Sequence, residues 1–157
     1  MTASGIPVMG HIGLQPQSVN SAGGYRVAGR DEAGIRKLNN DVLAIADAGA
    51  FSIVIEGTVN EVAESLTRAV AVPTIGIGAS AACDGQILVS EDMLGLTNGH
   101  KAKFVKPFAD LAPEIRTAMA QYAAEVRSRA FPAAAHIYLD KKDSQTAATP
   151  ADVSAKN

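Results

Sequence analysis

The sequence contains no tryptophan, few aromatic residues (4%) and a single cysteine, Cys83. One cysteine cannot form an intrachain disulfide, so we expect a reducing compartment and predict a cytoplasmic protein. The three histidines, His11, His100 and His136, lie far apart and make no metal-ligand spacing with Cys83. With so few aromatic residues, the core is expected to consist mainly of alanine, valine, isoleucine and leucine.

An excess of basic residues is also missing. Lysine and arginine number 14 against 16 aspartates and glutamates, for a net charge of −2. This balance argues against a nucleic-acid or anionic-membrane partner. No apolar run approaches the roughly 20 residues that a membrane helix needs, and the first residues, MTASGIPVMG, do not resemble a signal peptide. The 157 residues, 47% of them hydrophobic, predict a folded domain.

The most informative stretch is FSIVIEGTV, Phe51–Val59. Its continuous apolar run, rich in β-branched residues, predicts a parallel strand buried on both faces. The run ends in Glu56, and a carboxylate there is costly unless it faces a polar pocket. Ligands bind at the carboxyl ends of parallel strands, so Glu56 is the first candidate for chemistry. The alternative is a glutamate that caps the next helix or pairs with a neighbouring cation.

The rest of the chain alternates between strands and helices. A first strand is expected to end near Gly10, which places His11 where strand gives way to loop; a lone histidine there is either structural or part of a site. Apolar spacing and terminal residues predict helices over Asp31–Ala48, which Gly49 stops, and from Asn60, taken as the N-cap, to Val70. Further strands are predicted over Val72–Ile77 and Gln86–Val89.

Three connecting segments attract attention. The long, glycine-rich stretch Leu14–Arg30 is expected to cover or shape a site, or to be an ordinary surface excursion. Gly76 and Gly78 suit a loop whose amides hold an anion, or simply allow close packing. The link Ala79–Gly85 is short for a parallel crossover, so it is expected to be irregular or a single helical turn.

Beyond the sheet, Met93–Phe108 is expected to be mostly loop. Pro113 suits the first turn of a helix that runs to about Arg129, with Ile115, Met119, Tyr122 and Val126 on one face. The last residues are polar and without pattern. We therefore predict one domain over residues 1–137 and a disordered tail over 138–157.

Several long stretches resemble the ketopantoate hydroxymethyltransferase (3-methyl-2-oxobutanoate hydroxymethyltransferase) family. They are GIPVMGHIGLQPQSVN, GGYRVAGR, AGAFSIVIEG, VPTIGIGASAACDGQILVSEDMLGL and KFVKPF, and together they run from about Gly5 to His136. The resemblance implies an enzyme that moves a hydroxymethyl group from 5,10-methylenetetrahydrofolate to 3-methyl-2-oxobutanoate, a 2-oxo acid, in pantothenate biosynthesis. It further implies Mg²⁺ as cofactor and a homo-oligomer, usually a decamer.

The resemblance implies a (β/α)8 TIM barrel, of which this α/β chain would form the C-terminal half, about strands five to eight. It places Glu56 on the catalytic carboxylate after the sixth strand, and His11 on a substrate-binding histidine after the fifth. The family's metal-binding aspartates and glutamate and its substrate-binding lysine lie in the half that is absent, so no metal ligand is expected in this chain. Gly57-Thr58-Val59 stands where many members have a proline-containing turn.

A barrel of this class needs at least about 200 residues, so we expect 157 residues alone to be inactive. Two rival hypotheses remain. One is a related barrel that makes or breaks carbon–carbon bonds in phosphoenolpyruvate or 2-oxo acids, with Gly76 and Gly78 at a phosphate. The other is a non-catalytic half-barrel that serves as an assembly module.

Overall fold

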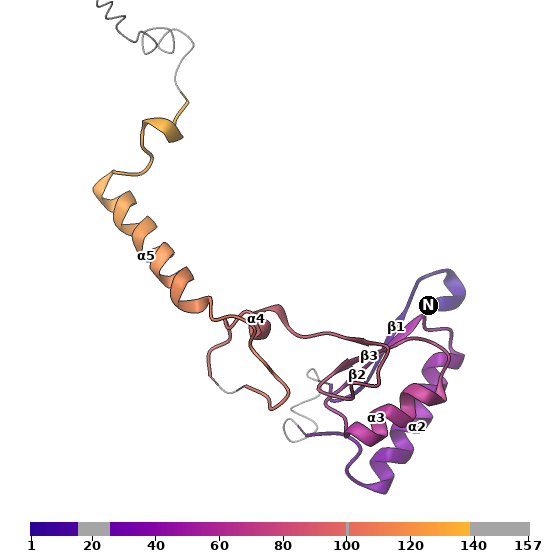
Figure 1. Ribbon diagram of the computed structural model, residues 1–157. Helices are drawn as coiled ribbons and strands as arrows, with labels where there is room; N and C mark the ends of the chain where they lie inside the picture. The colour runs from indigo at the N-terminus through magenta and orange to yellow at the C-terminus, as the bar shows by residue number, and fades with distance from the viewer. Residues whose placement is uncertain (16–25, 100, 139–157) are drawn as a thin grey trace, which may run out of the picture. The chain divides into compact units, whose positions relative to one another are not determined.

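The computed structural model describes residues 1–15, 26–99 and 101–138 (Figure 1). The chain divides into two compact units, Met1–Asp110 and Leu111–Asn157. Most of the long loop predicted over Leu14–Arg30 lies outside the described residues. So does the tail predicted over 138–157, apart from Tyr138.

The first unit is built on one sheet of four parallel strands in the order β1-β2-β3-β4. The strands are β1 (Met9–Gly13), β2 (Ser52–Glu56), β3 (Thr74–Ile77) and β4 (Gly85–Gln86). This confirms the predicted α/β class with a parallel sheet, and β2 ends at Glu56 as expected.

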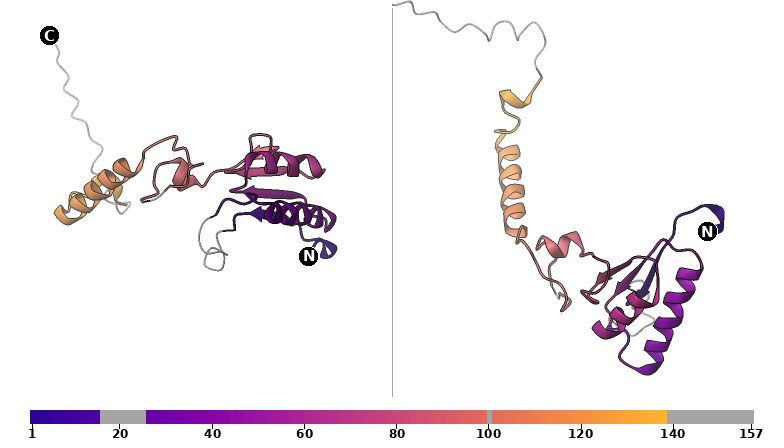
Figure 2. Two further views of the ribbon diagram at one scale, coloured as in Figure 1. Left: turned by 90° about the horizontal axis from the view of Figure 1, so that it is seen from below. Right: turned by 45° about the vertical axis from the view of Figure 1, so that its right-hand side comes forward.

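Two helices, α2 (Glu32–Asp47) and α3 (Asn60–Ala69), connect the first three strands and pack on one face of the sheet (Figure 1). In Figure 2, as in Figure 1, both run alongside the strands on the same side. Between sheet and helices lies the apolar core: Ile12, Leu38, Val42, Ile53, Ile55, Val62, Ala63, Leu66 and Cys83. It contains no aromatic residue, in agreement with the composition.

The helix ends follow from local chemistry, with one correction. The Asp31 carboxylate accepts a hydrogen bond from the backbone N–H of Gly34 at 2.7 Å, which caps α2. Gly49, just beyond the helix, has a φ of 85°, the conformation that suits a helix stop. The prediction that Asn60 caps α3 is wrong: Val59 is the N-cap, and Asn60 is the first helical residue. The backbone of Val59 is held by Ala28, whose carbonyl accepts its N–H at 3.0 Å, and this contact sets the boundary.

The first strand begins at Met9 and continues through Gly13, beyond the predicted end near Gly10. His11 therefore lies within the strand and not where strand gives way to loop. Gly10 does not end the strand. It lies within it and faces α2, where a Cβ at this position would lie 2.4 Å from Cγ2 of Ile45. Glycine is thus required for close packing between β1 and α2, and its low strand propensity is overridden.

Burial of β2 is complete on one face and partial on the other in the described part of the chain. Ser52, Ile53 and Ile55 are buried, whereas Val54 and Glu56 are only partly buried. Val54 lies on the face away from α2 and α3, where Ser52 is buried and the Glu56 side chain is 13% accessible. The continuous apolar pattern predicts a strand that can be covered on both sides, but it cannot say which segment covers the second side.

The link between β3 and β4 contains no helix. Residues 78–84 form turns and bends, yet the two strands still pair in parallel, with Ile75 opposite Gly85 and Gly76 opposite Gln86. The irregular link agrees with the prediction, while the strand predicted over Gln86–Val89 is limited to two residues, Gly85–Gln86. A single helical turn, α4 (Ser90–Met93), follows.

The second unit contains one long helix, α5 (Ala112–Ser128), with Pro113 in its first turn as predicted. Its apolar face remains exposed, with Ile115, Met119, Tyr122 and Val126 each more than 40% accessible. The described residues also contain a 3-10 turn in each unit: η1 (Thr2–Ser4) in the first and η3 (Ala134–His136) in the second. None of the helices in the described parts of the chain has the length and apolar character to cross a bilayer.

Candidate functional site

The candidate site is a pair of side chains on the two neighbouring strands β1 and β2. Nε2 of His11 lies 3.0 Å from Oε2 of Glu56. In the sheet His11 is opposite Val54, and Gly13 is opposite Glu56. Side chains alternate along a strand, so His11, Val54 and Glu56 project from one face. The pair is therefore a diagonal contact across two parallel strands, which only the register could bring about.

This face of the sheet is the one opposite α2 and α3. Ile12, Ile53 and Ile55 fill the helix-covered face and are buried. On the other face the side chain of Glu56 is 13% accessible and that of His11 is 34% accessible. A carboxylate accepts hydrogen bonds only, so His11 donates its Nε2–H to Glu56. The arrangement offers a shielded carboxylate beside a more exposed imidazole, which is suited to proton transfer with a small molecule.

The backbone at the end of β2 is held firmly. The carbonyl oxygen of Glu56 accepts hydrogen bonds from the N–H of Leu14 at 2.8 Å and from Oγ1 of Thr58 at 3.0 Å. On the other side, the N–H of Gly57 donates to the carbonyl of Ile77 at 2.9 Å. Glu56 is thus attached to both neighbouring strands, and its side chain starts from a fixed point.

Gly13 makes this anchoring possible. Its φ is 89°, and a Cβ there would lie 2.1 Å from the carbonyl oxygen of Glu56 and 2.6 Å from Oγ1 of Thr58. Only glycine combines that conformation with so little space. The glycine-punctuated segment after His11 therefore serves to bring β1 against the end of β2.

The two glycines suggested for an anion loop are instead explained by packing. A Cβ on Gly76 would lie 2.9 Å from Oε1 of Gln86 and 3.2 Å from the sulfur of Cys83. A Cβ on Gly78 would lie 2.3 Å from Cδ1 of Phe104. Both positions are occupied by side chains of this chain, which supports the packing alternative. Nothing in this geometry favours the rival hypothesis of a phosphate at these glycines.

A second carboxylate, Asp84, is found at the opposite end of the sheet. The backbone N–H and the hydroxyl of Thr74 donate to Oδ2 of Asp84 at 2.8 and 3.0 Å. These two hydrogen bonds, the backbone one first, lower the pKa of the Asp84 carboxyl below its usual value. Because Thr74 begins β3, Asp84 stabilises the start of that strand and lies away from Glu56. Sequence reasoning did not identify this contact.

The described residues do not form a magnesium site. No group of three or more histidine, cysteine, aspartate or glutamate side chains among them could hold a metal ion. Mg²⁺ requires near-octahedral oxygen coordination, and the site offers one carboxylate, which is already paired with His11.

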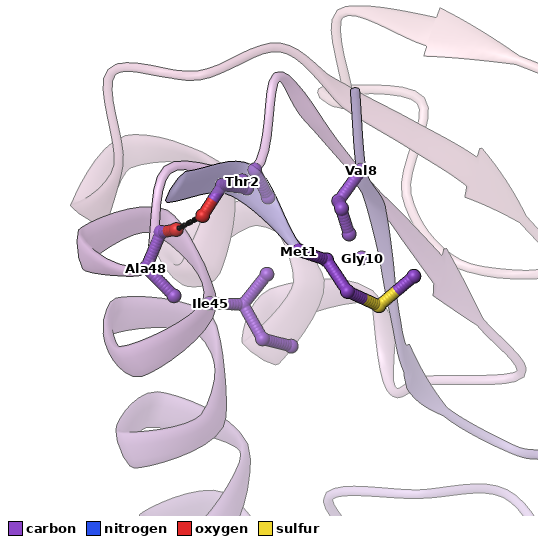
Figure 3. Close-up of a pocket in the computed structure, with 7 residues that line it drawn as sticks. Met1, Thr2, Val8, Gly10, Ile45 and Ala48 are labelled. Carbon is purple, nitrogen blue, oxygen red and sulfur yellow. Dashed lines mark hydrogen bonds between the residues drawn. The ribbon is translucent and has the colours of Figure 1, made fainter. Parts of the chain in front are cut away.

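An apolar pocket of about 240 Å³ lies on the helix side of β1 (Figure 3). It is lined by Met1, Thr2, Val8, Gly10, Ile45, Ala48 and Ala50. The hydroxyl of Thr2 donates to the carbonyl of Ala48 at 2.7 Å, so the lining presents hardly any free polar group. The pocket contains no titratable side chain and is therefore not a site for proton chemistry.

A sequence profile described as ketopantoate hydroxymethyltransferase matches residues 1–134 of the chain. A 3-methyl-2-oxobutanoate hydroxymethyltransferase of Sinorhizobium medicae is 56% identical over 142 residues, which are 90% of this chain and 52% of the relative. The protein of the same name from Mesorhizobium japonicum is 55% identical over 144 residues, 92% of this chain and 50% of the relative. The one from Rhodospirillum centenum is 54% identical over 140 residues, 89% and 51% respectively. The chain thus spans about half the length of the curated relatives it matches.

Proposed function

Because the chain belongs to the ketopantoate hydroxymethyltransferase family, we propose that it contributes one half of the active site of such an enzyme. The reaction would transfer a hydroxymethyl group from 5,10-methylenetetrahydrofolate to 3-methyl-2-oxobutanoate, giving ketopantoate for pantothenate synthesis in the cytoplasm. The observation that carries this proposal is the contact between His11 and Glu56 on the face of the sheet away from α2 and α3.

Glu56 is proposed as the general base. Its carboxylate would accept the proton from the carbon next to the ketone of 3-methyl-2-oxobutanoate. The resulting enolate carbon would then form a bond to the one-carbon unit, whose two bonds to the folate nitrogens break so that tetrahydrofolate leaves. One water molecule supplies the hydroxyl oxygen, and its two hydrogens together with the proton taken by Glu56 end on that hydroxyl and on the two nitrogens of tetrahydrofolate. A carboxylate needs a fixed position for this role because proton transfer depends on hydrogen-bond geometry. The hydrogen bonds from Leu14 and Thr58 to the backbone of Glu56 support such a position.

His11 is proposed to orient Glu56 and to contact the 2-oxo acid. One ring nitrogen, Nε2, is used by Glu56. The side chain remains about one third accessible, which leaves room for a small substrate on the same face. Among the described residues no hydrogen bond reaches the other ring nitrogen, Nδ1, and a histidine held at one nitrogen in this way suits a substrate-binding role better than a purely structural one.

The other half of the site is proposed to come from polypeptide equivalent to the unmatched half of the relatives. Two features support this. The sheet face away from α2 and α3 carries Val54 and Met9, and Met9 is 47% accessible. The outer edge of β1 is not paired with another strand among the described residues. Eight strands would then close a (β/α)8 barrel with this chain as its C-terminal half. The Mg²⁺ ligands would lie in that other half, since the described residues do not supply them, and the completed barrels would form a homo-oligomer.

Complementation tests this proposal. The 157-residue chain is mixed with the unmatched half of the Sinorhizobium medicae relative, and ketopantoate is measured with methylenetetrahydrofolate, 3-methyl-2-oxobutanoate and Mg²⁺. We expect product from the mixture and none from this chain alone. Glu56→Gln should reduce turnover by about 10²–10⁴-fold, the usual contribution of a general base. Glu61→Gln, on the exposed first turn of α3, is the matched control and should leave turnover unchanged.

A non-catalytic assembly module is the second candidate, favoured by the lack of a complete metal site in the described residues. In that case the two halves would associate without forming ketopantoate, and Glu56→Gln would behave like Glu61→Gln. Association measured by sedimentation together with the activity assay separates the two functions.

A further inference from the structure

The aromatic ring of Phe104 packs at the end of β3 and has no role in the function proposed above. Phe104 lies over Gly78: a Cβ at Gly78 would approach Cδ1, Cγ and Cε1 of the ring at 2.3, 2.5 and 2.8 Å. The ring therefore rests against the bare backbone of Gly78. Gly78 has a φ of 60°, so both its conformation and the space above it require glycine.

This ring stands at the same end of the sheet as Glu56. Gly78 directly follows Ile77, and Ile77 is the register partner of Glu56. Neighbouring strands are about 4.8 Å apart, so the backbone beneath the ring is close to that of the proposed base. Phe104 is still 38% accessible, although it packs on Gly78. A partly exposed ring beside a site can stack with a planar ligand.

The segment that carries Phe104 is strongly basic. Lys101, Lys103 and Lys106 fall within six residues, all three are exposed, and no acidic residue occurs between Lys101 and Ala109. The ion pairs formed among the described residues involve none of these lysines. The segment thus combines an accessible ring with a local positive charge, although the whole chain carries a net charge of −2.

The second ring of the segment provides a contrast. Nζ of Lys106 lies 5.0 Å from the centre of the Phe108 ring, a cation–π contact. Phe108 is 69% accessible, and the three atoms nearest to a Cβ at Gly78 all belong to Phe104. Phe108 is therefore the more exposed aromatic residue of the same segment and serves as the comparison for Phe104.

We propose that Phe104 and the lysines around it form the subsite for the folate co-substrate. A reduced folate combines a nearly planar bicyclic ring with a glutamate tail whose carboxylates are ionised at neutral pH. The bicyclic ring stacks on Phe104, and the carboxylates contact Lys101, Lys103 or Lys106. This inference rests on the proposed function, because it assigns one of the two substrates of that reaction to a place beside Glu56.

The absence of tryptophan makes a direct test possible. Phe104→Trp gives the chain a single tryptophan, and Phe108→Trp is the matched control. The probe is 5-formyltetrahydrofolate, a stable reduced folate, added to the 157-residue chain. We expect saturable quenching of the tryptophan at position 104, and at most weak quenching at position 108. Equal quenching at both positions, or none at either, would overturn the subsite.

Calorimetry of the unlabelled protein gives an independent measurement. Stacking on an aromatic ring is worth about 1–3 kcal/mol, so Phe104→Leu should weaken 5-formyltetrahydrofolate binding by about tenfold or more. Lys103→Gln should weaken it by a few fold and reduce its salt dependence. Circular dichroism checks that each variant folds, which is expected because both side chains are exposed. Unchanged affinity in a folded Phe104→Leu variant contradicts the proposal.

The complemented enzyme distinguishes failure of the subsite from failure of the function. With an intact subsite, Phe104→Leu raises the KM for methylenetetrahydrofolate and leaves the KM for 3-methyl-2-oxobutanoate unchanged. If ketopantoate forms and neither KM responds, the subsite is wrong and the function stands. If no ketopantoate forms although folate still binds at Phe104, the proposed function is wrong and the binding site stands.

Discussion

His11 and Glu56 are 45 residues apart in the chain, yet their side chains meet, with Nε2 of His11 3.0 Å from Oε2 of Glu56. The contact joins the middle of β1 to the last residue of β2. It depends on the parallel register and on Gly13, which allows the two strands to approach at this point.

His11→Ala should lower the kcat of the complemented enzyme by about tenfold or more, because Glu56 loses the donor that orients it. His11→Gln retains an N–H donor and should recover part of that loss. A purely structural histidine would instead reduce thermal stability equally in both variants without this difference in kcat. Steady-state kinetics and thermal unfolding of the two variants decide between these outcomes.

Gly13→Ala should destabilise the first unit by about 1–3 kcal/mol or more, since it adds strain and a clash with the carbonyl of Glu56. Gly99→Ala is the matched control. Gly99 also has a positive φ, 94°, but a Cβ there would meet no atom of the described residues within 4 Å. Urea unfolding should therefore show a smaller loss for Gly99→Ala, and equal losses would mean that the close approach at Gly13 has no energetic weight.

Gly10→Ala should weaken the packing of β1 on α2, because the new methyl group would lie 2.4 Å from Cγ2 of Ile45. Overpacking of this kind typically costs about 1–3 kcal/mol. In a protein that already carries Ile45→Ala, which removes the contacting side chain, Gly10→Ala should cost less stability than it does in the wild type. A double-mutant cycle measures this coupling, and strictly additive effects would contradict the contact.

The Asp84 carboxyl has a lowered pKa in the folded state because Thr74 donates two hydrogen bonds to it. The ionised form is therefore the one that stabilises the fold. Its contribution is complete above the unfolded pKa of about 3.9 and is lost as the pH falls through the lower folded value. Asp84→Asn should be less stable than the wild type at pH 7, and the difference should shrink below about pH 4. Urea unfolding at both pH values provides the check.

Much of the fold could be predicted from the sequence because local chemistry determined it. Helix α2 has a capping aspartate, a periodic apolar face and a terminal glycine, and its predicted range agrees with Glu32–Asp47. Where tertiary contacts decide, prediction failed. Gly10 was predicted to end the first strand, but it lies within that strand and packs against α2. Asn60 was predicted to be the N-cap of α3, but the hydrogen bond from Val59 to the carbonyl of Ala28 makes Val59 the N-cap.

The candidate site divides in the same way. The position of Glu56 at the end of a strand followed from the apolar run before it. Its contact with His11 could not be predicted, because it depends on which residues of β1 and β2 are opposite each other. Phe104 was missed for a similar reason: the glycine after a strand signals a close neighbour, but the sequence does not identify which one.

The helix-free link from β3 to β4 leaves that corner of the sheet held mainly by polar side chains, with Thr74 bound to Asp84 and Gln86 bound to the carbonyl of Ser80. Asp84, Gln86 and Ile87 are exposed, although Thr74 and Ser80 are buried. The backbone amide of Ile87, which donates to Gly76 at 3.0 Å, should consequently take up deuterium sooner than that of Ile53 beneath the helices. Opening of the chain would begin at this corner, beside the segment that carries Phe104, while the β1–β2 pair stays intact.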